Sequence, residues 1–318
     1  MTNPQEGDNR RIASRIALSK NQPSRWSEGQ DSPLRTGNSS PISDAQLPDS
    51  SAPSPRTSRR TLRRIQRDAN SRDLEILRSV GEYRFLTTSH LEALHFTDHA
   101  SKLAATRSAN RVLKRLSEQG LVTPLDRRVG GVRAGSAGYT WRLTASGNRL
   151  LHAADPDART HRFREPSERL LKHTIAVADT HIRLLKATTT GVELVRVQVE
   201  PWSWRPFLGL SGERRLLRPD LAAVTAQGEY EDHWFLEVDL GTEHPPTIVR
   251  KCQLYEDYRR SGVEQETHGL FPRVLWIMSS QVRVEKITAA LESSHIDMSL
   301  FRVITADQLV DTVIGGAA

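Results

Sequence analysis

The sequence predicts a mixed chain of α+β and α/β type: a small helical domain with a β-hairpin, then a larger domain built on a sheet, both preceded by a polar tail. Two observations support this fold class. Apolar residues recur at helical spacing between residues 72 and 120 and lead into a hairpin pattern. From residue 165 the pattern changes to a long amphipathic helix followed by apolar strands that alternate with helices.

Residues 1–68 are predicted to form a disordered basic tail. The stretch before Arg59 holds twelve serines and seven of the sixteen prolines, and it shows no sustained apolar period. Such a segment cannot bury enough apolar surface to offset the entropy of ordering it. Its last part, Arg59-Arg-Thr-Leu-Arg-Arg64, could lie on DNA or could be a solvated linker end.

Bulk composition narrows the class of protein. The 318 residues carry a net charge of +7, divided as +5 over residues 1–68, +5 over residues 69–160 and −3 over residues 161–318. A basic front part is typical of proteins that neutralise nucleic-acid phosphates. The single cysteine excludes an internal disulfide framework, and no apolar run has the length of a membrane span. We therefore expect a cytoplasmic protein without a membrane partner.

Residues 69–155 are predicted to form a winged helix. Helical stripes begin near residues 72, 87 and 110, and the segments 121–125 and 139–143 are typical strands. A glycine-rich basic loop joins these two strands. Three helices followed by such a hairpin are the pattern of this DNA-binding fold, in which the third helix enters the major groove.

Basic residues on the third helix and the wing are the candidate DNA contacts. Arg107, Arg111 and Arg115 recur every fourth residue and so share one face of the helix, roughly opposite Leu113 and Leu116. The alternative is an ordinary solvated helix face. The candidate residues for double-stranded DNA are Arg107, Arg111, Lys114, Arg115, Arg127, Arg128 and Arg133.

Two apolar segments of residues 165–318 each carry a carboxylate where a strand should reach solvent. Asp220 follows Leu217-Arg-Pro, and Glu237 lies within Trp234-Phe-Leu-Glu-Val-Asp-Leu240. A buried carboxylate is costly unless it is paired or shares a cation. Carboxylate oxygens suit Mg²⁺ or Mn²⁺, so Asp220 and Glu237 are candidate metal ligands.

The order Pro219-Asp220, sixteen residues, then Glu237 resembles the PD-(D/E)xK nuclease superfamily. The resemblance implies a restriction-endonuclease-like domain with αβββαβ order and a metal-dependent phosphodiester hydrolysis. Asp239 stands where that superfamily has its lysine; it is either a third ligand or a substitution that silences the site. Lys251, on the following helix, is placed to supply the missing cation. Candidate catalytic residues are therefore Asp220, Glu237, Lys251 and Asp239.

Other polar residues allow two interpretations. His173 and His181 are eight residues apart on the long helix, and we expect buried or interface histidines rather than metal ligands. Glu168 resembles the extra first-helix acid of some nucleases of the superfamily. Tyr255 and Tyr258 could touch a phosphate or base, or could cover the sheet.

Residues 70–315 as a whole resemble the replication-relaxation family of bacterial plasmids and integrative elements. The resemblance rests on Arg72-Asp-Leu-Glu-Ile-Leu, Leu113-Lys-Arg-Leu-Ser-Glu-Gln-Gly-Leu, Arg218-Pro-Asp220, Glu237-Val-Asp-Leu-Gly-Thr-Glu243 and Lys251-Cys-Gln-Leu-Tyr-Glu-Asp-Tyr258. It implies a role in plasmid replication or mobilisation, with replication or conjugation proteins as further partners.

Two functions follow from these features. The first is a DNA-binding accessory protein that grips duplex DNA through the winged helix. The alternative is a metal-dependent DNA endonuclease or nickase that uses Asp220, Glu237 and Lys251. Asp239 is the residue that distinguishes the two hypotheses, because it occupies the strand position where the superfamily has its lysine. The nuclease-like site is therefore either active or degenerate.

Overall fold

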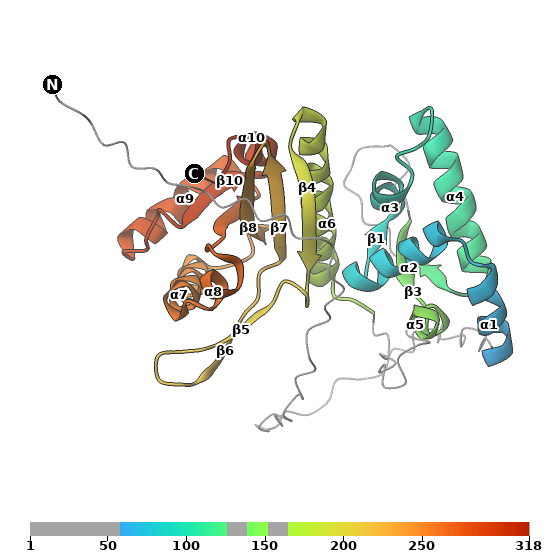
Figure 1. Cartoon of the computed structure of the whole chain (residues 1–318), viewed down its shortest axis with the longest axis horizontal. Coiled ribbons are helices and arrows are strands. Elements are labelled where there is room, and N and C mark those ends of the chain that lie inside the picture. The colour runs from blue at the N-terminus through green and yellow to red at the C-terminus, as the bar shows by residue number, and fades with distance from the viewer. Residues whose placement is uncertain (1–57, 126–138, 152–164, 318) are drawn as a thin grey trace, which may run out of the picture. The chain divides into compact units, whose positions relative to one another are not determined.

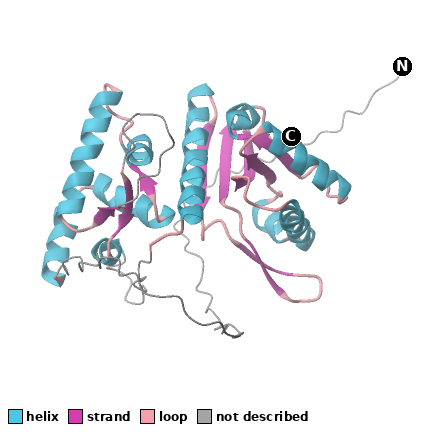
Figure 2. Ribbon diagram, turned by 180° about the vertical axis from the view of Figure 1, so that it is seen from behind, coloured by secondary structure: helices cyan, strands magenta, loops and turns pink. Residues whose placement is uncertain are grey.

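A computed structural model of the protein describes residues 58–125, 139–151 and 165–317 (Figures 1 and 2). These residues form a mixture of helices and sheets, so the predicted mixed class is confirmed. The described residues before position 152 form the helical region, and those from 165 onward form the sheet region. Among the described helices, none combines the length and the apolar composition that crossing a bilayer requires.

The helical region contains five helices and a three-stranded antiparallel sheet in the order β1-β3-β2. Side chains at the caps set where several of these helices begin: Asn70, Thr87 and Ser101 each accept a hydrogen bond from a backbone N–H of the first turn. The elements are α1 (Arg59–Asp68), α2 (Ser71–Tyr83), β1 (Leu86–Thr87), α3 (Thr88–His95), α4 (Lys102–Glu118), β2 (Val122–Pro124), β3 (Thr140–Leu143) and α5 (Ala145–Leu151).

The three predicted helices are present as α2, α3 and α4, and their apolar stripes form the core of this region. Ile76 and Val80 of α2 and Leu113 and Leu116 of α4 have at most 1% of their surface exposed. Helix α4 begins at Lys102, earlier than the expected start near residue 110, because Ala105 and Ala109 extend its buried face. The apolar period in the sequence is weak there because alanine carries little of the signal.

Two further helices lie outside the sequence prediction. Helix α1 lies inside the stretch 1–68 predicted to be a disordered tail, and that prediction is wrong for residues 59–68. Leu62 and Ile65, three residues apart, are buried on one side of α1, and its many arginines hide this short apolar stripe in the sequence. Helix α5 follows β3 directly, with Leu150 buried.

The sheet region is built on a five-stranded mixed sheet in the order β10-β9-β8-β7-β4. Strand β7 pairs antiparallel with both β4 and β8, whereas β8, β9 and β10 run parallel. The helices α7 and α9 connect the parallel strands, as βαβ crossovers require. The elements are α6 (Glu168–Ala187), β4 (Glu193–Val199), β7 (Leu221–Gln227), β8 (Tyr230–Asp239), α7 (Pro245–Ser261), β9 (Arg273–Met278), α9 (Gln281–Ser293) and β10 (Phe301–Thr305).

Successive side chains of β8 are buried on opposite faces of this sheet. This alternation determines the face to which the carboxylates of β8 point. Trp234, Leu236 and Val238 join the core cluster that contains residues of α6 and of α10 (Leu309–Ile314). Phe235 belongs to the other cluster, with Cys252 and Tyr255 of α7. By the two-residue period of a strand, Glu237 and Asp239 belong on the α7 side.

The remaining elements are shorter. The segment after β4, which carries Trp202 and Trp204, leads into a two-stranded antiparallel hairpin that Figure 1 shows extending from the sheet. The elements are η1 (Thr188–Thr190), β5 (Arg205–Leu208), β6 (Arg214–Leu217), α8 (Val263–His268), η2 (Ala306–Gln308) and α10 (Leu309–Ile314).

Two histidines bond across long sequence separations. Tyr83 Oη lies 2.6 Å from His181 Nδ1, and His90 Nε2 lies 2.9 Å from Asp179 Oδ1. Burial lowers the pKa of His181 to about 4, and the nearby His90 contributes to the shift. Burial also raises the pKa of Tyr83, so its hydroxyl stays protonated and donates to a neutral His181. The expectation that His181 is a buried or interface histidine agrees with these contacts.

We predict that His181 makes stability depend on pH. Between pH 6.5 and about 4 the unfolded chain binds a proton at His181 that the folded chain excludes, so the free energy of unfolding falls as the pH is lowered through this window. The total loss from this one group is about 3 kcal/mol or less. Urea denaturation across the window should show a flatter pH dependence for His181→Gln than for the wild type. Tyr83→Phe, which retains the imidazole, serves as control; an unchanged pH dependence in His181→Gln would contradict the assignment.

Candidate functional site

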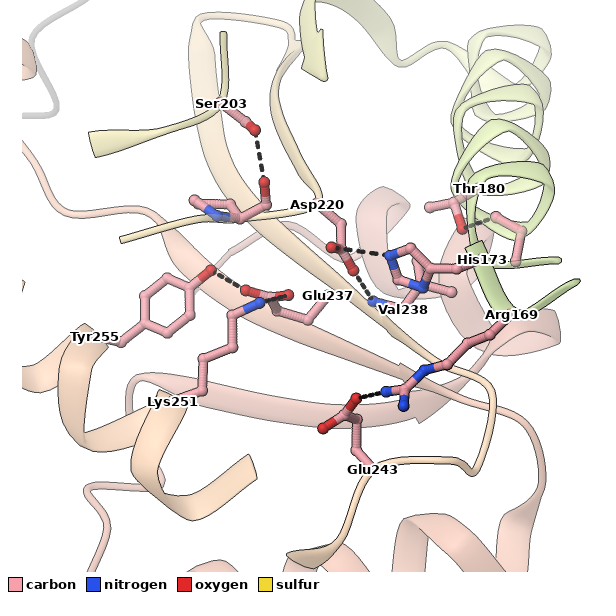
Figure 3. Close-up of polar contacts among 12 residues, drawn as sticks. Arg169, His173, Thr180, Ser203, Asp220, Glu237, Val238, Glu243, Lys251 and Tyr255 are labelled. Atoms are coloured by element: carbon pink, nitrogen blue, oxygen red, sulfur yellow. Dashed lines mark hydrogen bonds and ion pairs between the residues drawn. The ribbon is translucent and has the colours of Figure 1, made fainter. Parts of the chain in front are cut away.

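Asp220 and Glu237 are cross-strand neighbours at one end of the sheet. Leu221 of β7 pairs with Leu236 of β8 in antiparallel register, so the preceding residue, Asp220, lies opposite Glu237. Side chains opposite each other in such a pair have Cβ atoms about 5 Å apart and point to the same face. Figure 3 shows the two carboxylates close together where these strands meet.

Asp220 is held by one helix and one backbone group. Its Oδ1 lies 3.2 Å from Nε2 of His173 on α6, and its Oδ2 accepts a hydrogen bond of 2.8 Å from the backbone N–H of Val238 (Figure 3). Burial raises the pKa of Asp220, but the hydrogen bond to His173 and the charge of Lys251 outweigh that effect, and the net pKa is lowered. The same hydrogen bond raises the pKa of His173. Asp220 is therefore a carboxylate partnered by a histidine that favours the charged form.

Glu237 is held entirely by helix α7. Its side chain is buried, with Lys251 Nζ 2.5 Å from Oε2 and the hydroxyl of Tyr255 donating to Oε1 at 2.6 Å (Figure 3). Lys251 and Tyr255 are four residues apart and so lie on the same face of the helix. Both carboxylate oxygens thus have a donor, which is the condition for keeping this acid in the interior.

The two acids have opposite pKa shifts. Burial raises the pKa of Glu237 to about 8, and the charge of Asp220 adds to that shift while Lys251 opposes it. The pKa of Lys251 is also raised: burial lowers it, but the charges of Glu237 and Asp220 outweigh this effect. Asp220 and Glu237 share one lysine, and Glu237 is fully ionised beside Asp220 only above its raised pKa or where a further cation offsets its burial. A second cation would relieve the repulsion between them.

The donor set fits a hard cation that retains water or phosphate ligands. Mg²⁺ is commonly held by one or two carboxylates plus substrate phosphates, and each carboxylate oxygen has a second lone pair beyond the hydrogen bond it already accepts. Residues 58–125, 139–151 and 165–317 contain no group of three or more His, Cys, Asp or Glu side chains placed to hold a metal. Asp220 and Glu237 are thus the two side chains that could hold a Mg²⁺ or Mn²⁺ ion here, and such an ion would need water or substrate oxygens as its other ligands.

Asp239 is paired elsewhere. Its Oδ2 accepts from Nε of Arg283 on α9 at 2.6 Å, and its Oδ1 accepts from the backbone N–H of Gly241 at 3.0 Å. Arg283 also donates to the backbone carbonyl of Glu243. Among the described residues, no hydrogen bond or ion pair joins Asp239 to Asp220, Glu237 or Lys251. The structure thus gives Asp239 a role in holding the loop between β8 and α7, and it does not support either a third ligand or a catalytic group at this position.

Other residues of the region also have defined positions. Glu168, the acid that resembles the extra nuclease acid, is exposed and lies 2.8 Å from Lys172. Glu243 pairs with Arg169 of α6 (Figure 3). The contact of His173 with Asp220 was not predicted from the sequence, because 47 residues separate the two and no local spacing pattern indicates it. Tyr255, for which the sequence allows either a ligand contact or a place covering the sheet, covers the sheet: its ring packs on Phe235 and Phe301. Its hydroxyl also donates to Glu237.

The second candidate surface is the exposed side of α4. Arg107, Arg111, Lys114 and Arg115 are all exposed, whereas Leu113 is fully buried. Within the described part of the chain, Arg107 and Arg111 have no hydrogen bond or ion pair. Arg115 differs, because its guanidinium bonds at 2.5 Å to Asp73, a residue that is 4% exposed. Lys114 lies 3.9 Å from Glu118.

The hairpin predicted to be the wing is only partly described. Strands β2 and β3 pair antiparallel, with Val122 opposite Leu143, as the sequence predicts for a hairpin. The loop between them, with the candidate DNA contacts Arg127, Arg128 and Arg133, lies outside the described residues.

One protein family matches this chain over much of its length. The family model described as replication-relaxation covers residues 77–274, which is more than half of the chain. The chain belongs to the replication-relaxation family. The predicted family resemblance is thereby confirmed, and the matched range of this family member runs from α2 into β9. Among curated proteins, none matches the chain.

Two solved structures show low similarity to this family member. One is a mutant of MarR from E. coli complexed with operator DNA; it is 18% identical, with 41% of this chain and 83% of that chain covered and a TM-score of 0.22. The other is the restriction endonuclease FokI; it is 9% identical, with 80% of this chain and 71% of that chain covered and a TM-score of 0.22. A TM-score this low supports no argument about either fold or function.

We predict that Lys251→Met lowers the free energy of unfolding by about 3 kcal/mol, because it leaves Glu237 buried without its cation. Adding Glu237→Gln should recover most of that loss, since the amide still accepts from Tyr255 and needs no counter-charge. Chemical denaturation of the two single variants and the double variant measures the coupling. Lys286→Met, which removes an exposed lysine of α9, should change stability by less than about 0.5 kcal/mol. Additive effects of the two site substitutions would contradict the pairing.

Proposed function

We propose that this protein is a DNA-binding accessory protein of plasmid replication or mobilisation, and that its helical region is a winged helix that grips duplex DNA. The main support is α4: a helix packed through Leu113 and Leu116 that exposes Arg107 and Arg111, which have no intramolecular partners among the described residues. Unpaired arginines on the third helix of such a unit suit phosphate and base-edge contacts in the major groove.

The ion pairs of α4 divide its basic residues by role. The guanidinium groups of Arg107 and Arg111 are available to a ligand, and each could neutralise one DNA phosphate. Arg115 forms an ion pair with the buried Asp73, so its main role is to stabilise the fold. Only the exposed part of its guanidinium group would contact DNA. Membership of the replication-relaxation family agrees with a role at plasmid DNA, where replication or conjugation proteins are the proposed partners.

We predict that the full chain binds duplex DNA with strong salt dependence and that Arg107→Ala with Arg111→Ala weakens binding. Removing one phosphate contact should reduce the slope of log affinity against log salt by about 0.9, so the slope of the double variant should fall by about 2 if both residues contact phosphate. Fluorescence anisotropy over a range of salt concentrations measures this.

The matched control replaces two exposed basic residues of the sheet region, Lys286→Ala with Arg302→Ala. Binding by the control should match the wild type. The winged-helix assignment fails if the double variant of α4 binds as the wild type does, or if wild-type affinity hardly changes with salt. A base-reading arginine would show a different result, with a loss larger for the preferred sequence than for unrelated DNA.

A second candidate function is a metal-dependent DNA endonuclease or nickase. The supporting observation is that Asp220 and Glu237 are cross-strand neighbours with Lys251 2.5 Å from Glu237. In this proposal the restriction-endonuclease-like order of the sheet region positions Asp220 and Glu237 as ligands. Lys251, from α7, replaces the lysine that Asp239 excludes from β8.

Each residue of this site would have a defined task. A bound Mg²⁺ would polarise the phosphoryl oxygen and activate the attacking water. Lys251 would stabilise the negative charge that develops on the phosphoryl group. Tyr255 and His173 would orient Glu237 and Asp220 through the hydrogen bonds that they already make. Water would add to phosphorus and release one proton to solvent, one phosphodiester P–O bond would break, and the leaving oxygen would take a proton from solvent.

We predict that Mg²⁺ or Mn²⁺ raises the melting temperature of the wild type, because a cation relieves the repulsion between the two acids, and that Asp220→Ala abolishes the rise. Supercoiled plasmid incubated with the protein and either metal tests cleavage directly. Nicking by the wild type that disappears in both Asp220→Ala and Lys251→Met supports the nuclease. Metal stabilisation without nicking would leave a cation-binding site in a non-cutting protein, and equal melting temperatures with and without metal would remove the metal proposal.

A further inference from the structure

Helix α1 has an unusual charge for its length. Five of its ten residues are arginines and one is an aspartate, Asp68, so the helix carries a net charge of 5 − 1 = +4. Its first turn holds no acidic residue, although the positive end of a helix dipole favours acids there. Neither the DNA contact proposed for α4 nor the acidic site uses this helix.

One side of α1 is fixed to the protein. Leu62 and Ile65 are buried with exposed fractions of 9% and 8%, and the helix contacts α5. Ser58 caps its first turn, and Ala69 and Asn70 join it directly to α2. The helix is therefore held as part of the helical region, with its polar side turned to solvent.

That polar side is a stripe of four arginines. Arg60, Arg63, Arg64 and Arg67 are exposed, and none has a hydrogen bond or ion pair within the described residues. Their spacings of three and four residues bring like charges next to one another, which destabilises a helix. Four arginines with one acid, Asp68, at the end of the helix give a local charge conflict, and such conflicts are expected at functional surfaces.

We infer that the exposed side of α1 binds the phosphate backbone of duplex DNA, as a second contact beside the one proposed for α4. Guanidinium groups pair with phosphates in a fork geometry, and such contacts hold the duplex without reading its sequence. The inference rests on the proposed DNA-binding function and adds a separate surface to it. Relief of the arginine repulsion by phosphates should also make α1 more stable in the complex.

Duplex DNA fits this surface better than a membrane does. An amphipathic helix that binds lipid exposes large apolar side chains on the face that enters the bilayer. In α1 the apolar residues Leu62 and Ile65 are instead buried, and the described side chains of the helix include no exposed large hydrophobic residue. Its connection to α2 also places it next to the unit that carries α4.

The test compares the full-length protein with a variant in which Arg60, Arg63, Arg64 and Arg67 are each replaced by glutamine, a good helix former. Anisotropy with two unrelated duplexes should show the salt slope reduced by about 3 to 4, with the same fold loss of affinity on both. Hydrogen exchange of wild-type α1 should slow when DNA is added. The matched control replaces four exposed basic residues of the sheet region by glutamine, Lys186, Arg196, Lys286 and Arg302, and should keep the wild-type slope.

Several outcomes would overturn the inference. A slope equal to that of the wild type, in a variant with unchanged melting temperature, excludes α1 as a DNA contact even if Arg107→Ala with Arg111→Ala still weakens binding. Loss of binding to only one of the two duplexes would indicate base reading instead of backbone contact. Sedimentation of the wild type, but not of the variant, with vesicles of anionic phospholipid would assign the stripe to a membrane if the DNA slope is unchanged. Absence of any DNA binding by the wild type at low salt would instead reject the proposed function itself.

Discussion

The burial of Glu237 is the constraint on which the candidate site depends. With 1% of its surface exposed, this carboxylate requires a donor on each oxygen, and Tyr255 and Lys251 of α7 supply them. The requirement determines how α7 lies on the sheet, because both donors must face β8 at once. It also places the lysine ammonium of Lys251 beside two acids, Asp220 and Glu237, and the proposed nuclease site rests on this arrangement.

Pairing within the chain separates structural charges from available ones. Asp239 with Arg283, and Asp73 with Arg115, each combine a nearly buried acid with an arginine from a different element. These pairs hold the fold together, since removing one partner would leave a buried charge. Arg107 and Arg111 of α4 and the exposed arginines of α1 have no such acids among the described residues. These arginines are thus basic side chains that the ion pairs of the fold do not use.

Part of the fold and of the site could be predicted from the sequence because the signals are local. The apolar stripes of α2 and α4, the strand around Glu237 and the helix that carries Lys251 all follow from residue spacing. One exception is α1, where a stripe of only two apolar residues among arginines gave no readable period. Its order comes from packing of Leu62 and Ile65 against the rest of the helical region, and a sequence pattern does not contain that contact.

By itself the sequence determined which residues carry charge, which strands would be apolar and where Asp220, Glu237 and Lys251 would lie along the chain. Only the tertiary structure decided their partners. The bonds from His173 to Asp220, from Tyr255 to Glu237 and from Arg283 to Asp239 join different elements. The physical reason is that a buried charge takes whichever donor the packing of helices on the sheet brings within hydrogen-bond distance, and that choice depends on contacts between segments far apart in sequence.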